Sequence, residues 1–273
     1  MGQVGGRIWS DGFRVVKEFS ENNADAGNGH GHVLRIDLIE NINWGRRAQK
    51  GFLRSGIDPA DRKGHKNYYI DLLQKMALEE SLRLKGDEVV LDFGCGSGRI
   101  SYWIAPRVKK VVGVEITPEM IDLAERNRTA RNVEFVLYDG VHFPIFPFPF
   151  DLILSVGVLQ IMKGELLKNT LSSLAQYLKK DGMFCFIEHV SDSPRVGRPG
   201  LKEYLDAFES SGMECLQRYP IRKGRWWLLY LIRYGLVPHK WFSQIASWEM
   251  NKNRRKEDKN AYYKDYLFLL KRV

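Results

Sequence analysis

Residues 89–100 read Val89-Val90-Leu91-Asp92-Phe93-Gly94-Cys95-Gly96-Ser97-Gly98-Arg99-Ile100, and this stretch decides the fold. Its first five residues are an apolar run with one acid, which is typical of a buried strand. The three glycines lack a Cβ atom, so the backbone can turn sharply there and a ligand can approach it closely. A helical pattern begins at about Arg99. We therefore predict a strand, a glycine turn and a helix N-terminus, which together form a nucleotide-type binding corner.

The spacing of the glycines narrows the choice of ligand. The pattern is G-x-G-x-G, which differs from the G-x-G-x-x-G of dinucleotide-binding enzymes, and the sequence contains no G-x-x-x-x-G-K-[ST] phosphate loop. Asp92 directly precedes the turn, where its negative charge would repel a phosphate. A ligand that carries an ammonium group fits this corner better.

Further acids follow the next two predicted strands. The strand Lys110–Val114 ends at Glu115, about 20 residues beyond the glycine turn, where doubly wound folds place the acid that binds a ribose diol. The strand Asn132–Tyr138 ends at Asp139-Gly140, and an acid there can accept a hydrogen bond from an adenine amino group. A lone Asp139 would more simply be a cap or turn residue. Its place in a series of strand-end acids favours ligand contact, because ligands bind outside the carboxyl ends of parallel strands.

The helix after the second predicted strand has clear start signals. Thr117 suits the N-cap, Pro118 the first helical position, and Glu119 the positive end of the helix dipole. The apolar side chains of Ile116 and Met120 stand on either side of these residues. We predict that they sandwich a flat adenine ring.

Strands and helices alternate through the rest of the core. An amphipathic helix is predicted over His65–Arg83, before the first strand, and another from Val156 to about Lys180. This alternation predicts an α/β fold, namely a doubly wound, mostly parallel seven-stranded sheet with helices on both faces. The remaining strands are expected at Phe150–Ser155, Met183–Glu188, Met213–Tyr219 and Tyr266–Lys271.

The ordered set of glycines and acids resembles the motifs of class I S-adenosylmethionine-dependent methyltransferases. The set spans about 70 residues, and the resemblance extends through about Val190; it consists of Asp92, Gly94, Gly96, Gly98, Glu115, Asp139, Gly140, Asp151 and Ser155. The glycine motif alone would be a weak signal, whereas the whole set in this order and spacing is strong. The resemblance implies S-adenosylmethionine as the cofactor.

The resemblance also implies a role for each residue. The glycine loop would support the methionine part of the cofactor, and Asp92 would help to orient its amino group. Glu115 would hold the ribose, Asp139 with Gly140 would meet the adenine, and Gly157 with its neighbours would close over the sulfonium. The predicted cofactor-binding residues are Asp92, Gly94, Cys95, Gly96, Gly98, Glu115, Ile116, Met120, Asp139, Gly140, Ser155 and Gly157.

The sequence after the fourth strand bears on the acceptor. Enzymes of this class that methylate the exocyclic amines of bases often carry Asn/Asp-Pro-Pro-aromatic there, whereas this chain has Ser155-Val156-Gly157-Val158. No cysteine stands in a Pro-Cys pair there, as methylation of a base carbon would suggest. A small-molecule or a sugar- or lipid-linked acceptor is therefore favoured over nucleic acid, with O-methylation as the chemistry.

A hydroxyl acceptor is a poor nucleophile, and a general base would assist its methylation. The candidates are His189 and Glu188 at the end of the fifth strand, together with His142 after the third. The ordinary pKa of histidine lies near neutrality, which suits this role. Glu188 also has a structural interpretation as a strand-end residue, and His142 as a loop residue.

The composition is that of an ordinary globular protein. The 273 residues are 44% hydrophobic and 27% charged. Cys95, Cys185 and Cys215 form no C-x-x-C pair, so neither a disulfide framework nor a zinc site is expected. His30 and His32 lie in a glycine-rich stretch without a third ligand, so we predict no metal. No basic start followed by an apolar run marks a cleaved signal, and a cytoplasmic location is expected.

The positive charge is concentrated in the last third of the chain. The net charge is +9 overall, and it is +3 over residues 1–85, −2 over residues 86–190 and +8 over residues 191–273. One interpretation is a solvated basic surface. The other is a surface for an anionic acceptor or a membrane.

We divide the chain into an N-terminal extension or cap, residues 1–64, and a methyltransferase domain, residues 65–273, with an acceptor-side insertion at about 221–262. About 45 residues separate the last two strands, and they are rich in tryptophan and arginine. This insertion could pack as helices on the sheet edge, or form the acceptor pocket with the N-terminal residues. It could also contact a membrane peripherally through residues 222–248, although its apolar run is too short to span a bilayer.

Two alternatives to a small-molecule enzyme remain open on the sequence. The basic tail is compatible with an RNA methyltransferase, whose RNA binding would depend steeply on salt. A methyltransferase-like module that binds the cofactor without turnover is also compatible, because intact cofactor motifs do not by themselves establish transfer.

Overall fold

A computed structural model of the chain describes residues 42–140, 142–193, 197–224, 226–255 and 262–273. All of them belong to one compact unit, Arg35–Val273. His30 and His32 lie outside the described residues, as do most of the predicted N-terminal extension and residues 256–261 of the predicted insertion.

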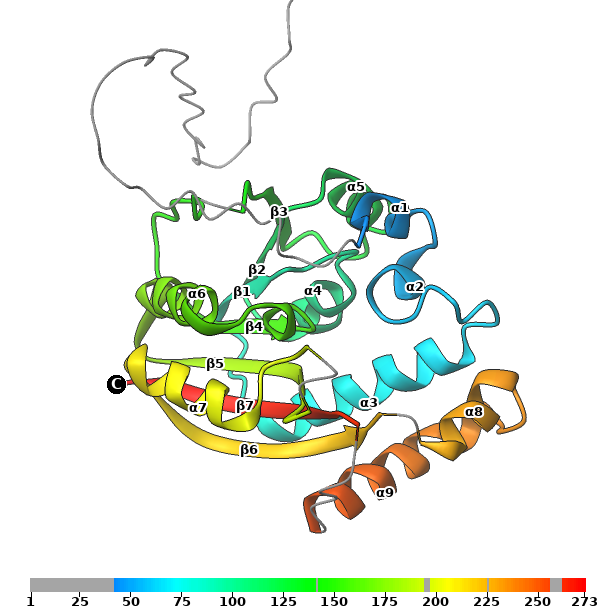
Figure 1. The fold of residues 1–273 in the computed structure, drawn as a ribbon. Coiled ribbons are helices and arrows are strands. Elements are labelled where there is room, and N and C mark those ends of the chain that lie inside the picture. The colour runs from blue at the N-terminus through cyan, green and yellow to red at the C-terminus, as the bar shows by residue number, and fades with distance from the viewer. Residues whose placement is uncertain (1–41, 141, 194–196, 225, 256–261) are drawn as a thin grey trace, which may run out of the picture. The chain divides into compact units, whose positions relative to one another are not determined.

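The described residues form one seven-stranded sheet, in the order β3-β2-β1-β4-β5-β7-β6 (Figure 1). Its first five members, β3, β2, β1, β4 and β5, pair in parallel, and β7 runs antiparallel to both β5 and β6. The strands are β1 (Val89–Phe93), β2 (Lys110–Glu115), β3 (Val133–Leu137), β4 (Phe150–Val156), β5 (Leu178–Val190), β6 (Met213–Lys223) and β7 (Lys264–Arg272). The predicted fold class is confirmed.

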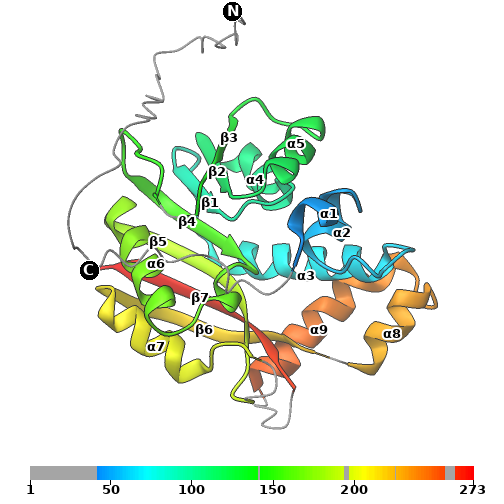
Figure 2. The same ribbon diagram turned by 45° about the horizontal axis from the view of Figure 1, so that its top comes forward.

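Helices cover both faces of the sheet because alternate strand side chains enter two separate cores. Val90 and Leu152 point to a core that is completed by α3, α4, α8 and α9, whereas Leu91 and Ile153 point to a core completed by α6 and α7 (Figures 1 and 2). The helices are α1 (Trp44–Ala48), α2 (Phe52–Gly56), α3 (His65–Ser81), α4 (Arg99–Ile104), η2 (Ala105–Arg107), α5 (Pro118–Arg126), η3 (Leu159–Ile161), α6 (Gly164–Tyr177), α7 (Leu201–Ser210), α8 (Trp227–Tyr234), η4 (His239–Trp241) and α9 (Phe242–Arg255).

The helix predicted from Val156 to about Lys180 is wrong at its start. The buried carboxylate of Glu188 accepts hydrogen bonds from the backbone amides of residues 158–160, each at 3.0 Å. These bonds hold the chain in the short 3₁₀ turn η3, and the α-helix begins only at Gly164.

The same prediction is wrong at its end, and the fifth strand is longer than expected. The helix ends at Tyr177 because Leu178 already pairs with Phe150 of β4. Asp181, predicted as part of a turn, has a φ of 65° within β5, and the register between β4 and β5 shifts in this region. The strand therefore covers Leu178–Val190 rather than Met183–Glu188.

The insertion between β6 and β7 folds as α8, η4 and α9, and it packs on the face of the sheet beside α3. One buried hydrogen bond ties α9 to α3, in which the Tyr69 hydroxyl donates to Oε2 of Glu249 at 2.6 Å. Burial raises the pKa of Glu249 to about 7, although Arg222 and the Tyr69 hydroxyl oppose this effect. The hydroxyl therefore stabilises a carboxyl group that has left water.

We predict that Tyr69→Phe lowers the free energy of unfolding by about 1–3 kcal/mol, the usual cost of leaving a buried polar group without its partner. Tyr68→Phe is the matched control, because Tyr68 is exposed and keeps its ring stacked on His239 without the hydroxyl. Urea denaturation of both variants measures the difference. Equal losses in the two variants would show that the bond to Glu249 contributes nothing.

Candidate cofactor and acceptor site

The glycine loop is fixed to the neighbouring strand through its backbone. The amides of Gly94 and Cys95 both donate to the carbonyl of Val114 on β2, at 2.9 and 3.0 Å. The Gly98 amide donates to the Cys95 carbonyl at 2.9 Å, which closes the turn into α4. The loop predicted from the sequence is therefore present at the carboxyl ends of β1 and β2.

Two of its glycines differ in what surrounds them. Gly98 has a φ of 80°, and a Cβ atom there would lie 2.8 Å from the ring of Phe135, so the position requires glycine for packing. Gly96 has a φ of 54°, but a Cβ atom there would meet no protein atom within 4 Å. The backbone at Gly96 is thus open to a ligand that approaches it closely.

Glu115 joins this loop to the start of α5. Its Oε2 accepts a hydrogen bond from the Gly96 amide at 3.0 Å, and its Oε1 accepts from the amides of Ile116 and Thr117 at 2.9 and 3.0 Å. Burial raises the pKa of this carboxyl, and the amide donors oppose the rise. Thr117 occupies the predicted N-cap position of α5, but its side chain makes no capping bond to the helix.

Asp92, predicted to help orient the amino group of the cofactor, has its carboxylate beside α4. Its carboxylate is buried and accepts a hydrogen bond from the Ser101 hydroxyl of α4 at 2.5 Å. Burial raises its pKa to about 6, against the opposing effects of Ser101 and Arg99. In this structure Asp92 fixes the glycine loop to α4.

The carboxyl ends of β3 and β4 complete the edge of the sheet at which the glycine loop lies. Asp139 accepts a hydrogen bond from the His142 amide at 2.7 Å, and its Oδ2 lies 2.9 Å from His142 Nδ1. The Gly157 amide donates to the carbonyl of Ile187, and the side chain of Val158 occupies the space beside Gly94. The β4 turn therefore packs directly on the glycine loop.

The predicted adenine sandwich is only half consistent with the structure. Ile116 is exposed at this edge, whereas Met120 is buried in a small cluster with Ala48 and Leu123, against which Trp44 packs. Met120 is thus a core residue that fixes α1 on α5. The segment 44–56 also reaches the glycine loop, where the Ser97 hydroxyl donates to the carbonyl of Phe52 at 2.7 Å.

Two other predicted cofactor residues are buried. Cys95 packs its Sγ against Gly113, and burial raises the pKa of its thiol well above the ordinary value. Ser155 is fully buried, and its hydroxyl has no hydrogen-bond partner among the described residues. Neither side chain reaches the surface of this edge, so any contribution they make to binding acts through packing.

A second polar group lies at the ends of β5, β6 and β7. His189 and Asp265 are direct cross-strand partners on β5 and β7, and His189 Nε2 lies 3.1 Å from Asp265 Oδ1. Arg222 of β6 donates to the other carboxylate oxygen of Asp265 at 2.6 Å. Burial alone would raise the pKa of Asp265, but Arg222 and His189 outweigh it and hold that pKa well below its usual range.

Gln160 links His189 to the turn after β4, which packs on the glycine loop. Its Nε2 donates to the Gly157 carbonyl at 3.0 Å, and its Oε1 accepts from the His189 amide at 3.3 Å. The imidazole of His189 is one-third exposed, and its ring contacts that of Tyr263. Glu188, the neighbouring candidate base, has no such access, because it is buried and anchors the η3 turn.

The sequence interpretation did not find Asp265, Arg222 or Gln160. No spacing rule connects residues 189, 222 and 265, and only the pairing of β5 with β7 and of β7 with β6 brings them together. Among the described residues, no group of three or more His, Cys, Asp and Glu side chains could hold a metal ion.

Comparisons with known proteins bear on this site. A family model described as "Methyltransferase domain" matches residues 90–182, about a third of the chain. An uncharacterized RNA methyltransferase of Clostridium tetani is 47% identical over 66 residues, which is 24% of this chain and 14% of that relative. (S)-coclaurine N-methyltransferase of Thalictrum flavum subsp. glaucum is 32% identical over 117 residues, which is 41% of this chain and 31% of the relative. The chain thus spans less than a third of the length of either relative.

A solved structure extends the likeness beyond the matched segment. A chain from the complex between the Haloferax volcanii Trm112 methyltransferase activator and the putative methyltransferase aligns with a TM-score of 0.58 at 16% identity. The alignment covers 84% of this chain and 96% of that one. Residues 90–182 match a methyltransferase domain, and the likeness to the solved structure shows a shared fold beyond them. The predicted family is therefore confirmed, while the relatives differ among themselves in the acceptors that their names give.

We predict that Gly96→Ala in this methyltransferase domain leaves the fold intact but weakens S-adenosylmethionine binding roughly tenfold or more, a loss of about 1.4 kcal/mol. The added methyl group meets no protein atom within 4 Å, so apart from the backbone strain at a positive φ it can interfere only with a ligand. Isothermal titration calorimetry measures the affinity.

The matched control for this variant is Gly86→Ala. Gly86 also has a positive φ and open space around it, but it lies in the turn before β1, away from the loop. Gly86 has a φ of 99°, farther from the left-handed region that alanine can adopt than the 54° of Gly96, so Gly86→Ala carries the larger backbone strain. Only Gly96→Ala should nevertheless lose affinity. Unchanged binding in Gly96→Ala would remove the loop from the cofactor site.

We predict that the protein loses stability as the pH rises from about 5 to 7. The pKa of Glu249 is raised from 4.5 to about 7 by burial, so the folded state keeps a proton that the unfolded chain has released. This group alone accounts for about 3 kcal/mol at most over that range. Asp92 and Glu188 act in the same direction, because burial raises their pKa values to about 6 and about 7.

Urea unfolding at several pH values measures this slope. Glu249→Gln should flatten it, because the amide does not titrate, whereas Glu209→Gln on the exposed side of α7 should leave it unchanged. A slope that is the same in both variants would mean that Glu249 is ionised in the folded state at neutral pH.

Proposed function

We propose that this chain transfers a methyl group from S-adenosylmethionine to a hydroxyl group of a small-molecule or a sugar- or lipid-linked acceptor. The observation that carries the proposal is the His189–Asp265 pair, which stands at the end of β5 and is joined through Gln160 to the turn beside the glycine loop. A polar group that can accept a proton is thus held next to the edge that fits the cofactor.

The residues of the cofactor edge fit S-adenosylmethionine in their chemistry. The open backbone at Gly96 admits a close ligand, and Glu115 is a carboxylate that can accept hydrogen bonds from both hydroxyls of a ribose. Asp139 and Gly140 would meet the adenine, and Gly157 with Val158 would line the side of the sulfur. When bound, S-adenosylmethionine supplies a methyl group on a positively charged sulfur.

His189 would act as the general base. Its Nε2 faces the carboxylate of Asp265, which favours the tautomer with a proton on Nε2 and leaves the Nδ1 lone pair available. The hydroxyl proton of the acceptor would pass to Nδ1 as the oxygen forms its new bond to carbon. The partial exposure of the imidazole supports this role, because an acceptor can reach it.

Asp265 would position His189 rather than react itself. Asp265 is buried, and its ion pair with the equally buried Arg222 keeps it charged. A charged partner fixes the ring orientation and stabilises the protonated imidazole that proton transfer creates. Arg222 would in turn hold Asp265 in place. The general base would thus be oriented by two buried groups.

An RNA acceptor is the second candidate. The name of the Clostridium tetani relative favours it, but the matched 66 residues amount to less than a quarter of this chain. The net charge of +8 over residues 191–273 is compatible with it as well. Non-catalytic cofactor binding is the third reading of the same domain.

The test is a labelled-methyl assay with the full-length protein on a cell extract, after calorimetry has measured S-adenosylmethionine binding. The extract is separated into lipid, small-molecule and nucleic acid fractions, and the label is expected in one of the first two. Label in RNA that disappears with nuclease would replace the proposed acceptor. Binding without any transferred label would favour the non-catalytic reading, and absence of binding would reject the proposal.

We predict that His189→Gln keeps cofactor affinity and lowers methyl transfer by about 10²–10⁴-fold, the usual contribution of a general base. His142→Gln is the comparison, because His142 contacts Asp139 at the cofactor edge and its loss should instead affect the KM for S-adenosylmethionine. Equal transfer by His189→Gln and the parent would exclude the base. Nitrogen NMR of the parent protein reads the tautomer directly, with the proton expected on Nε2.

A further inference from the structure

The helices of the insertion expose several large aromatic side chains to solvent. Trp227, Tyr230 and Tyr234 recur at helical spacing along the outer face of α8, while Leu229 and Ile232 on the inner face enter the core. The exposed set continues beyond α8 and consists of side chains that are 51–68% exposed, namely Trp227, Tyr230, Tyr234, Leu236, Trp241 and Trp248. We call these residues the aromatic patch.

The patch is held together across α8 and α9. Trp226, which precedes Trp227 in the chain, is buried. Its ring stacks on Trp248 of α9 at 5.6 Å between centroids and meets Trp227 edge-on at 6.4 Å. The buried Trp226 therefore fixes the exposed Trp227 and Trp248 relative to each other.

The charges around the patch have one sign. Residues 227–255 contain five Lys and Arg side chains and a single acid, Glu249, which is buried under α9. Arg233 and Arg254 point back to Asp58 and Glu80 on neighbouring segments. Lys240, Lys252 and Arg255 are exposed, so the charge that this surface presents to a partner is positive.

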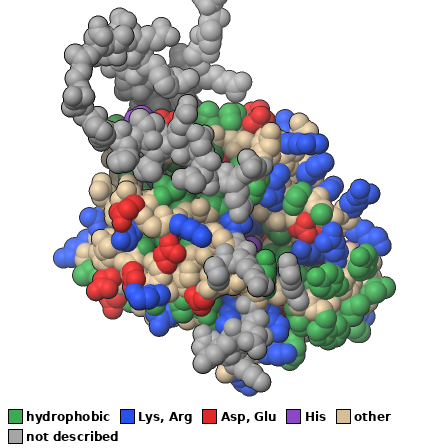
Figure 3. Space-filling view, viewed as in Figure 1, with side chains coloured by type: hydrophobic (Ala, Val, Ile, Leu, Met, Phe, Trp, Pro, Cys, Tyr) green, Lys and Arg blue, Asp and Glu red, His purple; other side chains and the backbone are tan. Residues whose placement is uncertain are grey.

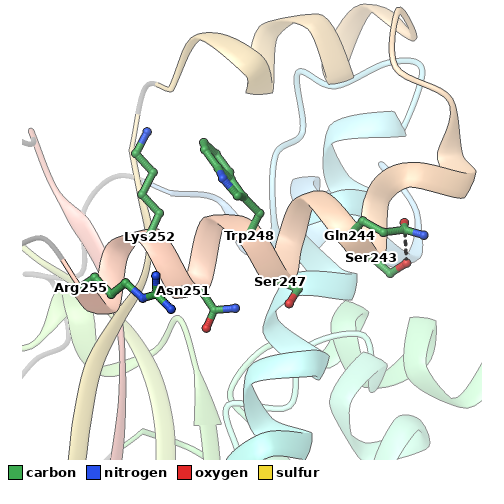
Figure 4. Close-up of a pocket in the computed structure, with 7 residues that line it drawn as sticks. All are labelled: Ser243, Gln244, Ser247, Trp248, Asn251, Lys252 and Arg255. Carbon is green, nitrogen blue, oxygen red and sulfur yellow. Dashed lines mark hydrogen bonds between the residues drawn. The ribbon is translucent and has the colours of Figure 1, made fainter.

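The figures show how the two kinds of side chain are arranged. Hydrophobic and basic side chains lie side by side over the part of the molecule that contains α8 (Figure 3). A shallow groove runs along α9, and Trp248 and Lys252 project from the same side of that helix (Figure 4). The Lys252 ammonium lies 4.6 Å above the Trp248 ring. Aromatic rings with basic groups at their margin match a lipid interface, where rings enter the headgroup layer and cations meet anionic headgroups.

We propose that the aromatic patch docks this protein on the surface of an anionic lipid bilayer. None of the helices in the described part of the chain is long and apolar enough to cross a membrane, so the contact is peripheral. The proposal does not depend on the methyl acceptor, and it holds whether or not the chain transfers a methyl group.

The composition of the patch favours a bilayer over RNA. Base stacking requires flat rings, whereas the most exposed member of the patch is the aliphatic Leu236, which follows α8. Trp227, Tyr230 and Tyr234 form a stripe on one amphipathic helix, and such a stripe lies in a planar interface. A groove for a nucleic acid backbone would instead be lined by a row of basic side chains.

The test is flotation of the full-length protein with phosphatidylcholine vesicles that contain or lack phosphatidylglycerol. We expect binding to the anionic vesicles only, and weaker binding as salt is added. Trp227→Ser/Tyr230→Ser should weaken it roughly tenfold or more. Lys240→Gln/Lys252→Gln should weaken it by about fivefold for each positive charge removed.

Two control variants match these changes in chemistry but lie elsewhere. Leu216→Ser removes an exposed apolar side chain of β6, and Lys180→Gln/Lys202→Gln removes two exposed lysines of β5 and α7. Circular dichroism and S-adenosylmethionine titration verify that every variant is folded. Absence of vesicle binding, or equal losses in patch and control variants, would overturn the proposal. Binding of labelled total RNA that falls in the patch variants, without vesicle binding, would assign the surface to nucleic acid.

Discussion

A carboxylate that leaves water must be given hydrogen-bond donors or a positive partner, and this requirement shapes the carboxyl edge of the sheet. Glu115 accepts hydrogen bonds from backbone amides of the glycine loop and of the start of α5. Glu188 accepts hydrogen bonds from the amides of the η3 turn. Asp92 accepts a hydrogen bond from the Ser101 hydroxyl, and this bond connects the loop to α4. Each acid thus fixes a loop whose conformation the strands alone would leave open, and a ligand would meet backbone already held in place.

The buried carboxylates around the ends of β5, β6 and β7 also have donors or positive partners, and here these partners are side chains. One oxygen of Asp265 accepts a hydrogen bond from Arg222 and the other lies 3.1 Å from His189 Nε2, while Oε2 of Glu249 accepts from the hydroxyl of Tyr69. A buried ion pair adds little net stability compared with apolar residues, because desolvation offsets its attraction. At the end of three adjacent strands, the pair instead serves to orient the carboxylate that faces His189. The neighbouring Glu188, by contrast, accepts three backbone amides and is buried, so an acceptor cannot reach it.

The sequence predicted what local pattern controls. Gly94, Gly96 and Gly98 identified the loop because glycine spacing directly reflects backbone conformation, and the alternation of strands and helices identified the sheet. It failed where tertiary contacts decide. The helix expected after Val156 is replaced by η3 because Glu188, about 30 residues away, binds its amides. The sequence could not predict the partner of His189 for the same reason. Asp265 is its neighbour only through the antiparallel pairing of β7 with β5. Met120 was predicted to contact adenine, and nothing in its local sequence shows that α1 also covers it.

The insertion between β6 and β7 connects the aromatic patch to the residues around His189. Arg222 stands near the end of the strand before it and Asp265 near the start of the strand after it, so any insertion at this point must preserve the geometry of that pair. Within α9, Trp248 faces solvent and the next residue, Glu249, faces the buried cluster. One turn of helix therefore carries both an outer contact residue and an inner carboxyl group that interacts with Arg222. The position of α9 against α3 and β6 consequently fixes how the aromatic patch is oriented relative to His189, and an acceptor held at the surface under the patch would approach the site from a defined direction.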